Sequence, residues 1–226
     1  ETDAEGSAEK LIEMSGRLCY QSWSKPNPAT QKNEDYIKHI LDSAHLSVIE
    51  HSGFSVAITG ASRSLTHELI RHRFLSVSQL SQRFFDETGA KFTIPPLFRG
   101  DEEAEAVIAR VYDVTMAAYQ ELMNIAKKKL EGEHDKSAKR KRAREAARCV
   151  LPNATETQLI ATANHRTWRE IFEKRGSSHA DAEIRELAVE IFKIARDIAP
   201  SIYQDMRLIS EDGKQTIEMV RQGGAV

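Results

Sequence analysis

Cysteine is scarce in this chain, with only Cys19 and Cys149 among 226 residues. Two thiols cannot build the disulfide framework of a small secreted protein, so we expect a reducing compartment, the cytoplasm. Both cysteines stand beside apolar residues, which is typical of small buried side chains and not of nucleophiles. Long apolar runs are also missing, because no stretch reaches the roughly 18 residues that a membrane-crossing helix needs. We therefore expect no membrane partner.

Metal-binding and dinucleotide-binding motifs are absent from the sequence as well. Eight histidines occur, but no His-Glu-x-x-His or paired Cys-x-x-Cys spacing groups potential ligands, so we predict no metal site. The segment Gly60-Ala61-Ser62 is too poor in glycine for a dinucleotide-binding motif. The formal net charge is only −2, and this near balance does not favour binding to nucleic acid or membranes.

The hydrophobic pattern predicts long helices and few strands. The expected helices cover about residues 7–20, 33–44, 62–73, 101–130, 136–148, 167–175 and 181–199, and the expected strands cover 53–60 and 155–163, with a terminal hairpin turning at 212–213. Without a βαβ rhythm, this mixture indicates an α+β fold in which long helices pack on a small, mainly antiparallel sheet. No linker divides the chain, so we expect a single domain over residues 1–226.

Two of these helices carry specific expectations about their buried faces. Leu11, Ile12, Met14 and Leu18 supply the apolar positions of the first helix. In the third, Ser62 is the expected N-cap, and Leu65, Leu69 and Ile70 form the expected core-facing side.

The segment 136–148 is strongly basic, with seven lysines and arginines against one glutamate. Such a helix could belong to a module that binds nucleic acid without being an enzyme. A solvated helical face is the favoured interpretation, because charge runs usually face water and no aromatic residue interleaves this one to stack on bases. Arg148 differs from the others, since it stands where an apolar stretch begins and can point inward.

Residues 71–83 hold the densest group of side chains suited to a phosphorylated ligand. Arg71-His72-Arg73 is followed within ten residues by three serines, two glutamines and Arg83. Arginine presents a planar fork of donors that matches phosphate and carboxylate oxygens, and a hydroxyl adds a short donor beside it. The alternative is a solvated helix end whose basic residues complement the helix dipole.

The motif Arg71-His72-Arg73, then seven residues, then Ser81 closely resembles the signature of the flavin-dependent thymidylate synthases. The resemblance continues in family order through 19–26 (CYQSWSKP), 45–51 (HLSVIEH), 147–153 (ARCVLPN), 164–166 (NHR) and 175–180 (RGSSHA). A short arginine-rich motif can arise by chance, but several blocks in one order hardly can.

The resemblance implies an enzyme that methylates deoxyuridine monophosphate (dUMP) to thymidylate (dTMP). In this family 5,10-methylenetetrahydrofolate supplies the carbon, NADPH supplies the electrons and bound FAD relays the hydride. Family members are homotetramers with active sites between subunits and form no cysteine adduct with the uracil ring. For this chain we expect no nucleic-acid partner, in keeping with its near-balanced charge. Relatives usually have a strand before the region that begins here, and the first residue is Glu1 and not Met, so we expect that an N-terminal strand is missing.

Residue by residue, the resemblance implies two catalytic side chains, Arg175 and His45. Arg175 faces the uracil edge and favours ionisation at N3, since a fixed cation stabilises a developing anion, and His45 lies near the isoalloxazine ring. The residues implied for dUMP are Glu68, Arg71, Gln79, Leu80, Ser81, Gln82, Arg83 and Arg148, with Ser81 and Arg83 on the phosphate and Arg148 usually from another subunit. The residues implied for FAD are Ser47, Arg71, His72, Arg73, Gln79, Asn164, His165, Arg166 and Glu170.

Two residues depart from the family pattern. Phe84 stands where many relatives have tyrosine, which removes a hydroxyl near the nucleotide. Glu170 stands where relatives tend to have a neutral or cationic group, and a carboxylate there disfavours an anionic cofactor edge. Among the remaining histidines, His51 and His67 are interpreted as core or surface residues, and His179 is a weaker site candidate.

Overall fold

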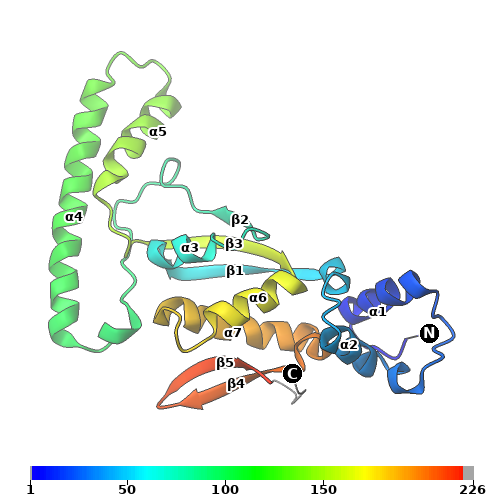
Figure 1. Cartoon of the computed structure of the whole chain (residues 1–226). Coiled ribbons are helices and arrows are strands. Elements are labelled where there is room, and N and C mark those ends of the chain that lie inside the picture. The colour runs from blue at the N-terminus through cyan, green and yellow to red at the C-terminus, as the bar shows by residue number, and fades with distance from the viewer. Residues whose placement is uncertain (1, 221–226) are drawn as a thin grey trace. The chain divides into compact units, whose positions relative to one another are not determined.

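The computed structural model describes residues 2–220, in which the chain forms seven α-helices and five strands (Figure 1). About 53% helix and 17% strand confirm the α+β fold. The helices are α1 (Ser7–Tyr20), α2 (Asn33–Asp42), α3 (Arg63–Leu69), α4 (Glu102–Lys129), α5 (Lys136–Ala147), α6 (His165–Arg175) and α7 (Ala182–Ile198). The strands are β1 (Gly53–Ser62), β2 (Ser76–Gln79), β3 (Glu156–Asn164), β4 (Met206–Glu211) and β5 (Lys214–Met219).

Strands β1, β3 and β2 form one sheet, in that order. Backbone hydrogen bonds show that β1 and β3 run antiparallel, because Ser52 O accepts from His165 N at 2.9 Å and Thr155 O accepts from Arg63 N at 3.1 Å. Gly53 permits the close approach of the two strands, since a Cβ atom there would lie only 2.2 Å from Ala163 O.

Strands β4 and β5 form the expected terminal hairpin. Their antiparallel register runs from Met206 opposite Met219 to Glu211 opposite Lys214. Asp212 and Gly213 turn the chain with φ angles of 49° and 74°, the left-handed conformation that an Asp-Gly turn provides. The Asp-Gly signal in the sequence therefore predicted this element correctly.

The described chain divides into two compact units. Unit 1 comprises the described parts of residues 1–56, 72–76 and 161–226, and unit 2 comprises residues 57–71 and 77–160. Strands β1 and β3 each begin in one unit and end in the other. The expectation of one domain over the whole chain stays a prediction.

Unit 1 contains an aromatic core beside α6 and α7. Trp168, Phe172, Phe192 and Tyr203 are fully buried, and the centroids of their neighbouring rings lie 5.3–6.1 Å apart. The indole of Trp168 also stacks on Phe54 at 5.1 Å and donates from Nε1 to Phe54 O. Burying a side chain of this size contributes about 1.5–3 kcal/mol. The cluster thus fixes α6, which carries several of the expected site residues.

Unit 2 contains the antiparallel pair α4 and α5, drawn in green in Figure 1. Tyr119 and Met123 of α4 bury themselves against Ala143 and Ala147 of α5, so the small residues of the basic helix let the two backbones approach. Asp101 caps α4 by accepting from Ala104 N. Although α4 is long, we find no helix among residues 2–220 whose length and apolar content would let it span a bilayer.

Helix α1 buries a different face from the one expected. Ile12 is fully buried, but Leu11, Met14 and Leu18 are exposed. Beside Ile12 and Gly16, the buried stripe contains the charged residues Glu9, Glu13 and Arg17. Arg17 donates to Glu13 at 2.7 Å and to Thr30 O at 2.7 Å. An ion pair that satisfies its own hydrogen bonds therefore replaces the apolar contact that the pattern predicted.

Helix α3 begins as predicted but ends early. Ser62 Oγ accepts from Leu65 N, which confirms the N-cap, and Leu65 and Leu69 are buried. The helix stops at Leu69 and leaves Ile70 exposed, so the inclusion of Ile70 in the core face was wrong. The serine-rich segment that follows contains β2, a strand that the sequence pattern did not predict.

Candidate active site

Gln79, at the end of β2 in unit 2, is held in a fixed orientation. Its Nε2 donates to Thr66 Oγ1 at 3.2 Å and to Thr157 Oγ1 at 3.3 Å. Both hydroxyls are buried, and they come from α3 and β3 respectively. The amide nitrogen therefore points inward, and the amide oxygen is the part of the group that the two threonines leave for a ligand.

The segment after β2 forms a compact turn that carries the expected phosphate ligands. Leu80 N donates to Gln158 O at 2.9 Å, and Leu80 O accepts from Arg63 Nη2 at 3.0 Å. Ser81 Oγ accepts from Arg83 N at 3.3 Å. Both faces of the Leu80 peptide are thus anchored, which fixes the start of the turn that carries Ser81 and Arg83.

Two groups of opposite charge near this turn, Arg63 and Glu87, influence each other's ionisation. Glu87 is almost fully buried, and burial raises the pKa of its carboxyl while the cation of Arg63 opposes the rise. Burial lowers the pKa of the Arg63 guanidinium, and Glu87 opposes that change. Arg63 therefore has two partners, the Glu87 charge and the Leu80 carbonyl. Gln82, which points inward from the same turn, is also buried.

Helix α5 contributes directly to the turn, a role that the basic run did not reveal. Arg83 pairs with Glu145 at 2.7 Å, and Arg144 donates to Phe84 O at 2.7 Å and pairs with Asp86 at 3.2 Å. Glu145 is the lone acid in the basic segment, and that isolation was the available signal. Phe84 itself is exposed, with the ammonium of Lys141 4.9 Å from its ring centroid.

The remaining dUMP candidates of unit 2 lie on either side of this turn in the sequence. Arg71 is exposed just beyond α3, and its backbone N donates to Glu68 O at 3.2 Å. Glu68 is half-buried. Arg148 is exposed at the end of α5, so the inward orientation expected from its neighbours is wrong for this chain. An exposed Arg148 can instead reach a second molecule.

In unit 1, His72 and Arg175 lie in direct contact. Arg175 Nε donates to His72 Nε2 at 3.2 Å, and His72 Nδ1 lies 3.9 Å from Glu170 Oε1. Burial lowers the pKa of His72, and the Arg175 cation lowers it further. Glu170 pairs with Lys174 at 2.6 Å, and this bond lowers the pKa of the Glu170 carboxyl. Glu170, which departs from the family pattern, is therefore accompanied by a cation, Lys174, that offsets its negative charge.

Three further FAD candidates lie at the start of α6. Asn164 Oδ1 caps the helix by accepting from Thr167 N, and the exposed Arg166 pairs with Glu50 at 2.5 Å. His165 is completely buried, and its Nδ1 lies 2.7 Å from Tyr203 Oη. Burial lowers the pKa of His165 to about 4. Its role toward FAD stays a prediction, although its ring belongs to the core of unit 1.

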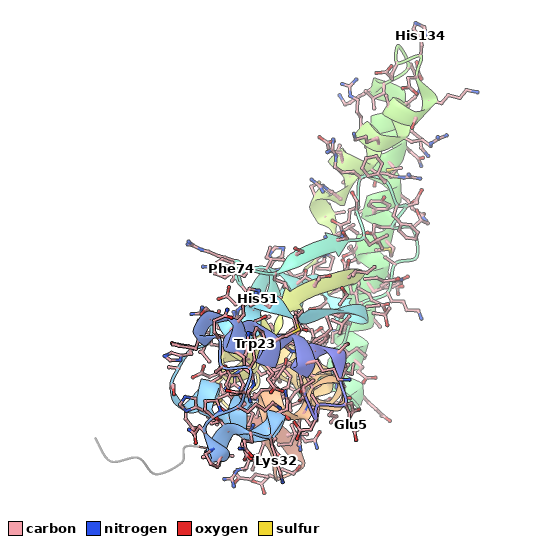
Figure 2. The ribbon with its side chains drawn as sticks, turned by 90° about the vertical axis from the view of Figure 1, so that its right-hand side faces the viewer. Glu5, Trp23, Lys32, His51, Phe74 and His134 are labelled. Atoms are coloured by element: carbon pink, nitrogen blue, oxygen red, sulfur yellow. The ribbon has the colours of Figure 1, made fainter. Side chains whose placement is uncertain are left out.

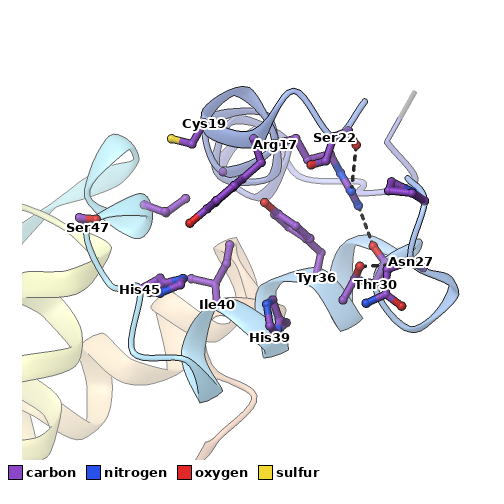
Figure 3. Close-up of a pocket in the computed structure, with 14 residues that line it drawn as sticks. Arg17, Cys19, Ser22, Asn27, Thr30, Tyr36, His39, Ile40, His45 and Ser47 are labelled. Atoms are coloured by element: carbon purple, nitrogen blue, oxygen red, sulfur yellow. Dashed lines mark hydrogen bonds between the residues drawn. The ribbon is translucent and has the colours of Figure 1, made fainter. Parts of the chain in front are cut away.

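A cavity of about 450 Å³ in unit 1 borders the two candidates from the loop after α2 (Figure 3). His45 and Ser47 lie on its wall, and Arg17 and Tyr36 line it from α1 and α2. The guanidinium carbon of Arg17 lies 4.2 Å from the Tyr36 ring centroid. Sequence reasoning did not assign these two residues to a site.

The other candidates lie at the surface. Arg73 is exposed, and so is the neighbouring Phe74, 79% accessible and labelled at the molecular surface in Figure 2. His179 is exposed as well. Cys19 and Cys149 are both exposed, so the expectation that they are buried was wrong. Cys19, near the end of α1, also borders the cavity that His45 and Ser47 line, and Cys149 lies in the short turn after α5.

No group of three or more histidine, cysteine, aspartate or glutamate side chains is placed to hold a metal ion within residues 2–220. The groups present are hydrogen-bond donors and fixed cations. In unit 2 they surround a turn with a hydroxyl and an arginine, a combination that suits a phosphate dianion. In unit 1 they include Arg175 beside the His72 imidazole, whose pKa burial lowers.

Comparison with known proteins gives one consistent match. The family model described as thymidylate synthase complementing protein matches residues 2–201. Three curated relatives are each named flavin-dependent thymidylate synthase. The relative from Mycobacterium sp. (strain KMS) is 49% identical over 212 residues, covering 92% of this chain and 83% of its own length. Those from Mycolicibacterium gilvum (strain PYR-GCK) and Mycobacterium avium (strain 104) are 49% and 48% identical over 207 residues, each covering 92% of this chain and 82% of the relative.

Proposed function

Because the chain belongs to the flavin-dependent thymidylate synthases, we propose that it methylates dUMP to dTMP with 5,10-methylenetetrahydrofolate as carbon donor, NADPH as reductant and FAD as cofactor. The anchored turn after β2 is the observation that carries this proposal. It presents Ser81 and Arg83 from a backbone fixed on both sides of Leu80, which is what recognition of a nucleotide phosphate requires. The other residues that bind dUMP in this proposal are Glu68, Arg71, Gln79, Leu80, Gln82 and, from another subunit, Arg148.

The side chains assigned to FAD suit a ligand with two phosphates. Arg71, Arg73 and Arg166 are exposed cations, and Asn164 and Gln79 offer amide groups held by other hydrogen bonds. Ser47, His72, His165 and Glu170 complete the set. When bound, FAD relays the hydride that reduces the transferred one-carbon unit. The protein's own part is to orient the reactants and hold charge.

Arg175 and His45 are the catalytic residues of the proposal. Arg175 holds a permanent positive charge at the uracil edge, so it favours loss of the N3 proton and stabilises the anion that forms. His45, on the cavity wall, orients the ring system beside it. Neither exposed cysteine takes part, because the reaction passes through no adduct between a thiol and the uracil ring.

The active enzyme is a homotetramer with active sites between subunits. Val107, Val111 and Val114 of α4 are exposed at three- and four-residue spacing, so one face of this helix is apolar and lacks cover within the described chain. The exposed Arg148 needs a second subunit to meet a ligand. Both observations support assembly with further copies of the chain.

Flavin binding provides the first test of the proposed function. The purified protein is expected to be yellow and to hold about one FAD per chain, released on denaturation. Arg166→Ala should weaken FAD binding, because it removes a cation from the predicted phosphate contacts. Arg207→Ala, which removes a comparable exposed arginine from the β4–β5 hairpin, is the matched control. A protein that binds no flavin at saturating FAD would contradict the proposal.

Nucleotide binding by the anchored turn provides the second test. Arg83→Ala should weaken dUMP binding by about 1.5–3 kcal/mol, roughly 10- to 150-fold in Kd, the usual worth of a bond to a charged group. Glu145→Gln should strengthen binding, since Glu145 now competes with the phosphate for Arg83. Arg142→Ala is the control, because Arg142 pairs only with Glu133 in the described structure. Unchanged titration of dUMP into Arg83→Ala would remove Arg83 from the site.

The alternative of a nucleic-acid-binding module rests on residues 136–148 and makes a different forecast. Arg142 and Arg144 of this helix already pair with Glu133 and Asp86. We therefore expect duplex DNA to bind weakly if at all. Tight binding that falls steeply with added salt, in a protein without flavin, would favour the alternative.

A further inference from the structure

His72 makes a hydrogen bond that fixes its own protonation state. Arg175 Nε carries a hydrogen and can only donate, so His72 Nε2 must present a lone pair at the 3.2 Å contact. The ring is therefore neutral, with its proton on Nδ1. Burial and the adjacent guanidinium lower the pKa of His72, in agreement with a neutral ring.

The charges around the ring favour the same tautomer. Glu170 lies 3.9 Å from Nδ1, too far for a direct hydrogen bond but close enough to attract the proton on that nitrogen. Lys174 pairs with Glu170 and limits this attraction, and Lys174 and Arg175 both disfavour a second proton on the ring. Arg166 also acts on Glu170 and lowers the pKa of that carboxyl.

The bond also constrains the arginine. It uses the Nε–H, whereas four of the five N–H donors of an arginine lie on the two terminal nitrogens. An acceptor at Nε fixes the plane of the guanidinium and therefore the direction in which those four donors point. The acceptor has little freedom to move, because the His72 imidazole is attached directly at Cβ and is buried.

We propose that His72 is a positioning residue for Arg175: its neutral ring, with Nε2 as acceptor and Nδ1–H toward Glu170, holds the guanidinium in the orientation that the uracil edge requires. This inference rests on the proposed function, in which Arg175 acts on N3. It gives His72 a role separate from the contact to FAD that the family resemblance implies. Glu170 then orients His72, which accounts for a carboxylate at a position where it departs from the family pattern.

A pair of amide variants separates positioning from other roles of the ring. The amide oxygen of His72→Gln can reach the place of Nε2, whereas that of His72→Asn falls short by one bond. Both variants are neutral and polar, so a loss of FAD contact affects them alike. At saturating FAD and dUMP, the kcat of His72→Asn should be roughly tenfold or more below that of His72→Gln, the worth of one bond to a charged donor. The KM for dUMP should change little in either variant.

Two further measurements make the outcome decisive. The double variant His72→Asn/Arg175→Ala should be no slower than Arg175→Ala alone, because either change already abolishes the hydrogen bond between the two side chains. In the ¹⁵N-histidine spectrum of the holoenzyme, His72 should show an unprotonated Nε2 whose resonance moves in Arg175→Ala. Equal kcat values for the two amide variants, or a protonated Nε2, would overturn the proposal. If the parent protein makes no thymidylate, the proposed function fails, and the spectrum still decides whether the bond exists.

Discussion

At the scale of single residues, the buried ionisable groups of unit 1 determine how the protein responds to pH. His165 is 0% exposed and bonded to Tyr203, and its pKa of about 4 lies below the ordinary 6.5. Between pH 4 and pH 6.5, His165 therefore binds a proton in the unfolded chain but stays unprotonated in the folded chain. The contribution of His165 to the free energy of unfolding is therefore fully present above pH 6.5 and is lost progressively as the pH falls toward 4.

We predict that His165 alone makes folding about 3 kcal/mol less favourable at low pH than at neutral pH, since each unit of pKa is worth about 1.4 kcal/mol. His165→Asn keeps a polar atom near Nδ1 but cannot titrate, so it should flatten the fall in stability. Urea denaturation at about pH 7 and about pH 4.5 measures the effect. His134→Asn, at an exposed histidine, is the control, and an equal slope for the two variants would contradict the prediction.

Some residue-scale features were readable from the sequence and others were not. Ser62 was identified as an N-cap because capping depends on a local pattern, and its hydrogen bond to Leu65 N confirms it. The exposure of Cys19 and Cys149 was missed because burial depends on neighbours in space. The charged stripe of α1 was missed for the same reason, since the partners of Arg17 include Thr30, a distant residue in sequence.

At the scale of elements, the end of α6 is fixed by a glycine. Arg175 is the last residue of the helix, and Gly176 N donates to Phe172 O at 2.8 Å. Strand β5 continues the contact, because Ile217 N donates to Gly176 O at 2.8 Å. The hairpin at the end of the described chain thus determines where Arg175 is placed.

Gly176→Ala should therefore reduce both stability and turnover. A Cβ atom at this position would lie 2.6 Å from Ile217 Cδ1 and 2.6 Å from Phe172 O, and the backbone oxygen cannot move away easily. Overpacking of this kind costs about 1–3 kcal/mol. Adding Ile217→Ala should restore only part of the loss, because the contact with Phe172 O remains. Thermal unfolding and kcat are the measurements, and Gly132→Ala, which meets no atom within 4 Å, should change neither.

The helices and the long strands were predictable from sequence because their periodicity extends over many residues. Strand β2 was not, since its four residues, Ser76–Gln79, carry no strong apolar alternation. It exists because β3 offers it a partner, a non-local cause that a local pattern does not contain. The role of residues 71–83 toward phosphate stays a prediction, and the residues that hold the turn of this stretch, Arg63 and Glu145, come from elsewhere in the chain.

At the scale of the whole molecule, the two units share their longest strands. The chain passes between them at residues 56–57, 71–72, 76–77 and 160–161, and three of these crossings lie within strands, one each in β1, β2 and β3. If one unit unfolds, the strands that continue into the other unit are therefore interrupted.

We accordingly expect one cooperative unfolding transition, in keeping with a single domain. Leu69→Ala in unit 2 and Ile171→Ala in unit 1 each remove a side chain that is 1% exposed, and each should cost about 2–5 kcal/mol. Both variants should lower the midpoint of the same calorimetric transition. Two separated transitions, with each variant moving only one, would show that the units fold independently.

The aromatic core also gives the protein a built-in optical signal. The chain has two tryptophans, and both lie in unit 1. Trp168 is 0% exposed between Phe54 and Phe172, whereas Trp23 is 46% exposed and labelled at the surface in Figure 2. Indole emission shifts to longer wavelength in water, so the intact protein should emit in two bands, and iodide should quench only the redder one. In Trp23→Phe a single blue emission remains, and its shift to the red reports the loss of the α6 core without any added label.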